Sequence, residues 1–185
     1  MMAYADLREE AEALLAAATG DDEGLTYLVG SLFLHDCYKE LVSGPDERMH
    51  YVTGLKLGTV LTMDRIISFA LDAATPVFAQ GNLASSHQAL MRLTRFGHRL
   101  HGLFHSHPGR GKEATHPSHI DLDTQERQEC GRYPVVGAIF SRDGFVRFFS
   151  VRNRFSIVTY GEGIEHVGET VYRLTELGDN PAPDR

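Results

Sequence analysis

The stretch that decides the fold is LHGLFHSHP at residues 100–108, an apolar run that ends in two histidines and a proline. The run Leu100–Phe104 predicts a buried strand. His105 and His107 follow two residues apart, and alternate side chains of a strand point to the same face, so both imidazoles can reach one ion. Pro108 has no backbone N–H to donate, which predicts the end of the strand. The stretch therefore predicts a strand that ends in a pair of metal ligands.

A second stretch, SHID at residues 118–121, supplies a candidate for the third ligand. A helix is predicted from about residue 119 to residue 130, and its dipole favours a carboxylate in the first turn, where Asp121 lies. Ser118 is then the predicted N-cap, with Asp121 at the third helical position. Two imidazoles and one carboxylate suit Zn²⁺ and leave one coordination position open, as in catalytic zinc sites.

Together the stretches HSHP and SHID resemble the signature of the JAMM (MPN/JAB) zinc metalloproteases, H-x-H-P followed by S-x-x-D. Three further segments resemble elements that the family has in the same order: the predicted helix Leu34–Ser43, YVTGLKLG at 51–58 and YPVV at 133–136. The resemblance covers roughly residues 25–155. It implies a single MPN/JAB-like domain, a Zn²⁺ cofactor, and His105, His107 and Asp121 as its ligands.

The resemblance also implies an activity and a partner. Family members of this kind cleave after the C-terminal tail of a ubiquitin-like protein, either to remove it from conjugates or to process a precursor. Bacterial members accompany ubiquitin-like conjugation machinery, including antiviral defence systems. Ser118 would stabilise the oxyanion of the reaction. The alternative is a non-catalytic scaffold that retains the metal and binds a ubiquitin-like protein.

The sequence departs from the family in two places. The loop between His107 and Ser118 is longer by about three residues, a change that costs little free energy. The position of the family's general-base glutamate is Tyr51, and tyrosine is a poor base at neutral pH. Glu47 has the same strand parity as Tyr51, although a straight strand separates them by about 13 Å. Glu47 is the predicted base, and Glu113 in the longer loop is the alternative.

Six of the ten histidines lie between residues 98 and 119, so four of them need another interpretation. His101 has the strand parity of the two ligands and could line the same face. His116 and His119 flank Ser118 and are alternative ligands. His98 is expected to be structural.

The rest of the chain predicts an α/β fold of the α+β type, with a mixed sheet flanked by helices. A chain of 185 residues fits one domain. We expect an N-terminal helix and loop over residues 1–24, the main domain over 25–177 and a disordered tail over 178–185. The elements predicted outside the motifs are strands at 25–29, 51–61, 64–73, 135–140, 145–151 and 155–160, and a helix around 89–96.

Composition excludes several classes of protein. A net charge of −7 argues against nucleic acid as a partner, and with it against a role of a JAB domain in DNA repair. No apolar run is long enough to span a membrane. The acidic N-terminus does not resemble a signal peptide, so a cytoplasmic protein is expected. Two cysteines, Cys37 and Cys130, rule out a disulfide framework.

Overall fold

The computed structural model describes residues 24–67, 71–75, 78–81, 88, 91, 94–131 and 133–175. The predicted N-terminal helix and the predicted tail lie outside the described residues, and so do residues 89, 90, 92 and 93 of the helix expected around 89–96.

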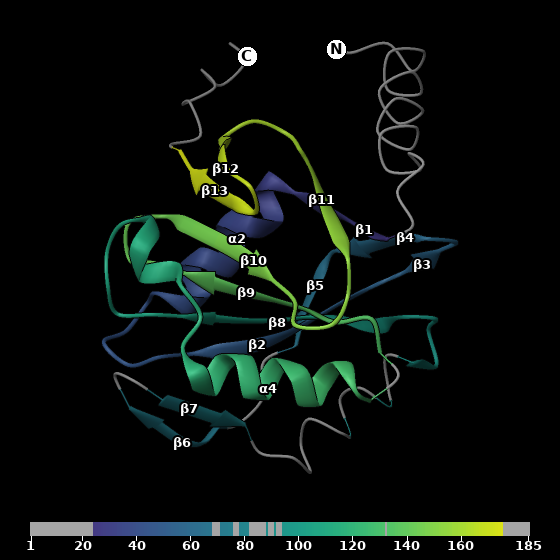
Figure 1. Ribbon diagram of the computed structural model, residues 1–185, viewed down its shortest axis with the longest axis horizontal. Coiled ribbons are helices and arrows are strands. Elements are labelled where there is room, and N and C mark those ends of the chain that lie inside the picture. The colour runs from purple at the N-terminus through teal and green to yellow at the C-terminus, as the bar shows by residue number, and fades with distance from the viewer. Residues whose placement is uncertain are drawn as a thin grey trace, which may run out of the picture.

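The described strands form two mixed sheets and a separate hairpin (Figure 1). The larger sheet has the order β12-β13-β10-β9-β8-β2-β5, in which only β8 and β9 pair in parallel. Its strands are β2 (Met49–Gly54), β5 (Arg65–Ile67), β8 (Arg99–Ser106), β9 (Val136–Phe140), β10 (Phe145–Phe149), β12 (Ile164–Gly168) and β13 (Val171–Leu174). The smaller sheet has the order β11-β1-β4-β3, formed by β1 (Leu25–Gly30), β3 (Lys56–Leu57), β4 (Val60–Met63) and β11 (Phe155–Tyr160). β6 (Leu71–Thr75) and β7 (Phe78–Gly81) form the hairpin. The predicted mixed α/β fold is confirmed.

Helix α2 (Ser31–Leu41) covers one face of the large sheet and closes the main core. Its apolar residues recur at helical spacing, so Leu34, Cys37 and Leu41 all point inward and are buried. They belong to one apolar cluster with Phe104 of β8 and Phe148 of β10, and neither of these rings is exposed to solvent. This packing fixes β8 from behind, in the view of Figure 1.

The opposite face of β8 carries a smaller apolar cluster and the helix α4 (His119–Glu129). Leu103 lies on this face because side chains alternate along a strand, and His105 follows it there two residues later. Gln125 of α4 donates a hydrogen bond to the carbonyl of Val135 over 2.8 Å. Figure 1 draws α4 below β2 and β8, and the contact between His105 and Asp121 places the first turn of α4 beside the end of β8.

One predicted strand is wrong in extent. Residues 51–61 do not form a single strand but are divided among β2, β3 and β4. β2 belongs to the larger sheet, and β3 and β4 belong to the smaller one. The break follows Gly54, where a Cβ atom would overlap the carbonyl of Thr62. Only glycine allows the backbones of β2 and β4 to approach this closely. The predicted partner strand at 64–73 is confirmed as β5, which pairs with β2, whereas residues 71–73 belong to β6 of the separate hairpin.

The C-terminal strands β12 and β13 were not predicted from the sequence, nor was a hairpin of β6 and β7. The other predicted strands and the helices over 34–43 and 119–130 are confirmed to within a few residues. Among the described helices, none has the length and apolar character that a membrane span requires.

Candidate metal centre

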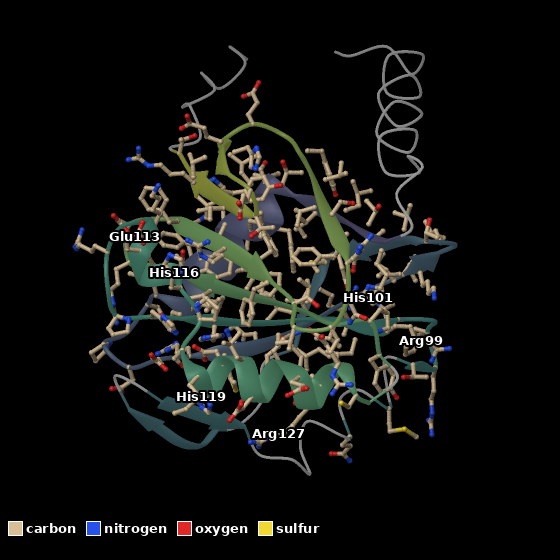
Figure 2. All side chains as sticks on the ribbon, in the orientation of Figure 1. Arg99, His101, Glu113, His116, His119 and Arg127 are labelled. Atoms are coloured by element: carbon tan, nitrogen blue, oxygen red, sulfur yellow. The ribbon has the colours of Figure 1, made fainter. Side chains whose placement is uncertain are left out.

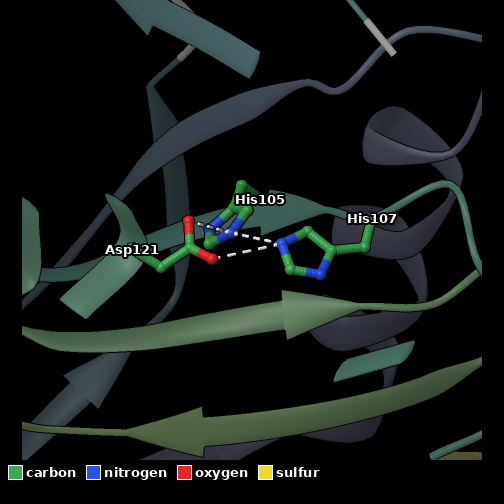
Figure 3. A group of neighbouring side chains, drawn as sticks. All are labelled: His105, His107 and Asp121. Carbon is green, nitrogen blue, oxygen red and sulfur yellow. Dashed lines mark hydrogen bonds and ion pairs between the residues drawn. The ribbon is translucent and has the colours of Figure 1, made fainter. Parts of the chain in front are cut away.

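His105, His107 and Asp121 converge on one point at the end of β8 (Figure 3). The Nε2 atom of His105 lies 3.1 Å from Oδ1 of Asp121, and Nε2 of His107 lies 3.3 Å from Oδ2. The two Nε2 atoms are 3.2 Å apart. The structure therefore brings the three predicted ligands together, although 13 residues lie between His107 and Asp121 in the chain.

The ring of His107 is oriented by the loop that follows it. Its Nδ1 atom lies 2.9 Å from the carbonyl oxygen of Ala114. A carbonyl can only accept, so Nδ1 carries the hydrogen and Nε2 is the atom that can offer a lone pair to a metal. Burial lowers the pKa of His107, but its hydrogen bonds to Asp121 and Ala114 outweigh burial and raise the pKa above its ordinary value.

Asp121 is held by the start of α4. The Ser118 hydroxyl accepts from the Asp121 backbone N–H over 3.3 Å, and the Asp121 carboxylate accepts from the Ser118 backbone N–H over 2.7 Å. This reciprocal pair is the predicted N-cap, in capping-box form. Burial raises the pKa of Asp121, yet hydrogen bonds from His105, His107 and Ser118 hold that pKa far below its usual range. The group is therefore a carboxylate at neutral pH, as a metal ligand must be.

This set of donor atoms fits a divalent metal ion. One ligand atom from each of the three residues lies within 4.8 Å of the other two, close enough for one ion to replace the direct contacts. The donor set is two imidazole nitrogens and one carboxylate, which suits zinc, and three protein ligands leave a coordination position for substrate or water. Among the described residues, no other group of histidine, cysteine and acidic side chains meets the same criterion.

Glu47 is placed toward this site by the register of β2. Met49 pairs with His105 across the antiparallel ladder, so the same register continued by two residues puts Glu47 opposite His107. The backbone hydrogen bond from Ser106 to the Arg48 carbonyl, 3.0 Å long, keeps the two chains paired there. Burial and the negative charge of Asp121 raise the pKa of Glu47 to about 7, while the nearby His107 acts in the opposite direction.

The alternative base, Glu113, lies elsewhere. It is on the short helix η1 (Lys112–Thr115), its side chain is 74% exposed, and it pairs with His116 over 3.0 Å. Tyr51 lies two residues after Met49 on β2, so it pairs with Leu103 and not with the ligand His105. It packs beside Leu100, Leu103 and Val135. Its burial raises its pKa, which makes it a still weaker base.

The remaining histidines near the motif do not join the three ligands. His101 is fully buried and its Nδ1 atom donates to the carbonyl of Thr62 over 2.8 Å. His116 pairs with Glu113 and His119 with Asp123, over 3.0 and 3.4 Å. Figure 2 shows His116 beside Glu113 on η1, with His101 toward the other end of β8. His101 therefore does not join the three ligands, and a β-bulge between Val52 and Thr53 shifts the register beside it.

One contributor to the site was missed at the sequence level, namely the Ala114 carbonyl. A backbone group leaves no trace in residue identity. The available signal was the longer loop itself, which the structure folds into η1 directly beside His107.

No protein-family model matches the chain, and a search of curated proteins finds no match. The comparisons with solved structures do find similar chains. A protein from Desulfitobacterium hafniense, determined in solution, is 15% identical, with a TM-score of 0.54 over 74% of this chain and 94% of that chain. This likeness concerns the fold alone. A JAB1/MPN domain protein from Archaeoglobus fulgidus is 17% identical, with a TM-score of 0.43 over 70% of this chain and 97% of that chain.

Proposed function

We propose that this protein is a zinc-dependent peptidase or isopeptidase of the JAMM type that cleaves after the C-terminal tail of a ubiquitin-like protein. The observation that carries the proposal is the convergence of His105, His107 and Asp121 at the end of β8. The substrate class rests on the resemblance of HSHP and SHID to the family signature.

The surroundings of the three ligands support a catalytic role. When bound, a zinc ion supplies a Lewis acid that polarises the scissile carbonyl and activates water. Glu47, with a pKa of about 7, is suited to accept a proton from the attacking water and return it to the leaving amine. The Ser118 oxygen already accepts from the helix, which leaves its hydrogen free to bond the oxyanion.

Apolar surface beside the site gives a substrate something to bind. Ile120 and Leu122 flank Asp121 in the first turn of α4, with 55% and 40% of their surfaces exposed. An extended tail would add main-chain hydrogen bonds along a strand edge.

The experiment uses zinc-loaded and metal-stripped protein with two probes, ubiquitin carrying a C-terminal fluorophore and a lysine-linked diubiquitin. We expect cleavage by the loaded protein only, and none by His107→Ala. His119→Ala is the matched control, because this exposed histidine pairs with Asp123 and not with the ligands.

A second candidate function is a scaffold that binds a ubiquitin-like protein without cleaving it. Tyr51 favours it, since an apolar-packed tyrosine stands where the family has its base. Bound zinc together with uncleaved probes, at high protein concentration, would support the scaffold and contradict the peptidase. Absence of bound zinc would contradict both.

A further inference from the structure

The β9–β10 hairpin contacts η1, and η1 in turn contacts the ligand His107. The starting point is the hydrogen bond from Nδ1 of His107 to the Ala114 carbonyl, 2.9 Å long. His107 follows the last residue of β8, and its backbone N–H donates to the Phe140 carbonyl over 2.9 Å, but this bond does not orient its ring. Its ring can keep Nε2 toward Asp121 only while Ala114 stays in place. The contacts that fix the position of Ala114 therefore also fix the orientation of the ligand His107.

The helix η1 cannot hold itself in place. It has four residues, and Gly111, its N-cap, offers no side chain to bond the free backbone N–H groups. Short 3₁₀ segments also have poorer hydrogen-bond geometry than α-helices. Its position must come from neighbouring elements.

Asp143, in the turn between β9 and β10, anchors the N-terminal end of η1. Both of its carboxylate oxygens accept from the backbone N–H of Gly111, at 2.8 and 2.9 Å. The hydroxyl of Ser141 donates to the same carboxylate over 2.7 Å, which fixes the acceptor in turn. Burial raises the pKa of Asp143, but the bonds from Ser141 and Gly111 outweigh it and lower that pKa, so the charge persists at neutral pH.

Arg147, on β10, anchors the C-terminal end of η1. Its Nε atom donates to the hydroxyl oxygen of Thr115 over 3.2 Å. Thr115 is fully buried, and its hydroxyl donates to the carbonyl of Lys112 over 2.5 Å, which closes the turn around Ala114. The guanidinium also lies 3.2 Å from Nε2 of His116.

We propose that Asp143 and Arg147 are positioning residues for the metal site: by holding η1 from both ends, they keep the Ala114 carbonyl where it fixes the ring of His107. The proposal rests on the metal site proposed above. It also explains the longer loop between His107 and Ser118, because this loop supplies the Ala114 carbonyl that accepts from His107. Neither residue touches the ion or the substrate.

The test uses three variants that disturb η1 in different ways. Asp143→Ala and Arg147→Ala each remove one anchor. Gly109→Ala leaves both anchors but places a Cβ atom 2.7 Å from that of Ala114, which must then move. The matched control is Arg152→Ala, an arginine on the segment after β10 that pairs with Glu126 over 2.7 Å, away from η1.

Zinc affinity is measured by competition with a chromophoric chelator. Loss of a partner that orients a ligand weakens metal binding by about 10–100-fold, so we expect at least about a tenfold loss in each of the three variants. Arg152→Ala should bind zinc as the wild type does. A merely structural role would instead lower the melting temperature of the metal-free protein and leave zinc affinity unchanged, which would overturn the proposal.

The hydrogen on Nδ1 of His107 gives a second readout that needs no metal. Long-range ¹H–¹⁵N spectra of the metal-free protein should show this hydrogen in slow exchange with water in the wild type, because it is held by the Ala114 carbonyl, and in fast exchange in the three variants. Unchanged exchange of the Nδ1 hydrogen in all three would contradict the proposal. If the wild type shows the Nδ1–H form yet binds no zinc, the proposed function fails while the support of His107 by η1 stands.

Discussion

At the scale of single residues, the decisive question is which group moves the proton. The register of β2 favours Glu47 as this group, whereas the distance along a straight strand from Tyr51 to Glu47 had counted against it. Met49 is opposite His105, so the level of the ligands on β2 is reached at residues 47–49 rather than at residue 51. Burial is the main reason that the pKa of Glu47 is raised to about 7; the charge of Asp121 adds to the rise, and the charge of His107 opposes it.

Glu47→Gln should therefore abolish turnover while zinc stays bound. Removing a general base typically lowers the rate about 10²–10⁴-fold. Zinc content should not change, because Glu47 is not among the three ligands. The measurement is kcat alongside zinc content, with Glu113→Gln as the matched control at an exposed position. A fully active Glu47→Gln enzyme would assign the proton transfer to another group.

The pH dependence of the rate follows from the same group. A base acts in its ionised form, so the rate should rise with pH through the pKa of Glu47. That pKa is about 7 without metal, and a nearby divalent cation favours the carboxylate and lowers it. The rise in kcat/KM of the zinc enzyme should thus lie below pH 7. A rise centred well above pH 7 would point to a different ionisation.

At the scale of elements, the first turn of α4 has two roles that can be separated. Ser118 caps the helix and is also the proposed oxyanion donor. Ser118→Ala should lower the free energy of unfolding by about 1 kcal/mol, whereas Ser118→Asn should keep the cap. Both should lower kcat by about 10²–10³-fold, since neither retains the hydroxyl. Denaturant unfolding and kinetics of the two variants check this, and an active Ser118→Asn enzyme would leave Ser118 only its capping role.

The elements also show how far the sequence predicts this fold. The strand ending at His105 and the cap at Ser118 were predictable because both depend on local rules, alternation of side chains and N-cap chemistry. The division of residues 51–61 was not, because it depends on the close approach of Gly54 to Thr62, a contact between strands. The place of Glu47 likewise depends on the register between two strands, which no single segment encodes.

At the scale of the whole molecule, buried histidines make stability depend on pH. His50 is 8% exposed and, among the described residues, neither of its ring nitrogens has a hydrogen-bond partner. Burial lowers its pKa in the folded state. Below about pH 6.5 the unfolded chain binds a proton that the folded chain does not, so acidification should lower stability. Glu47 acts in the opposite sense, because its raised pKa favours the folded state at low pH.

His50→Phe isolates the contribution of His50 to the loss of stability at acidic pH. Replacing a buried, unpaired polar ring by an apolar one of similar shape should leave the melting temperature equal or higher at neutral pH. Between about pH 6.5 and 5 the variant should lose less stability than the wild type, and the contribution of Glu47 cancels in the comparison. Melting curves across this range provide the measurement. Parallel pH profiles for the two proteins would mean that His50 does not stay neutral in the fold.

The central claim is that His105, His107 and Asp121 form a metal centre. The most direct test is the zinc content of metal-stripped protein after incubation with zinc and dialysis, measured by mass spectrometry of the elements. The wild type and His119→Ala should each retain one zinc ion per chain, and His107→Ala and Asp121→Ala should retain almost none. A wild type without zinc, or full zinc retention by Asp121→Ala, would contradict the account.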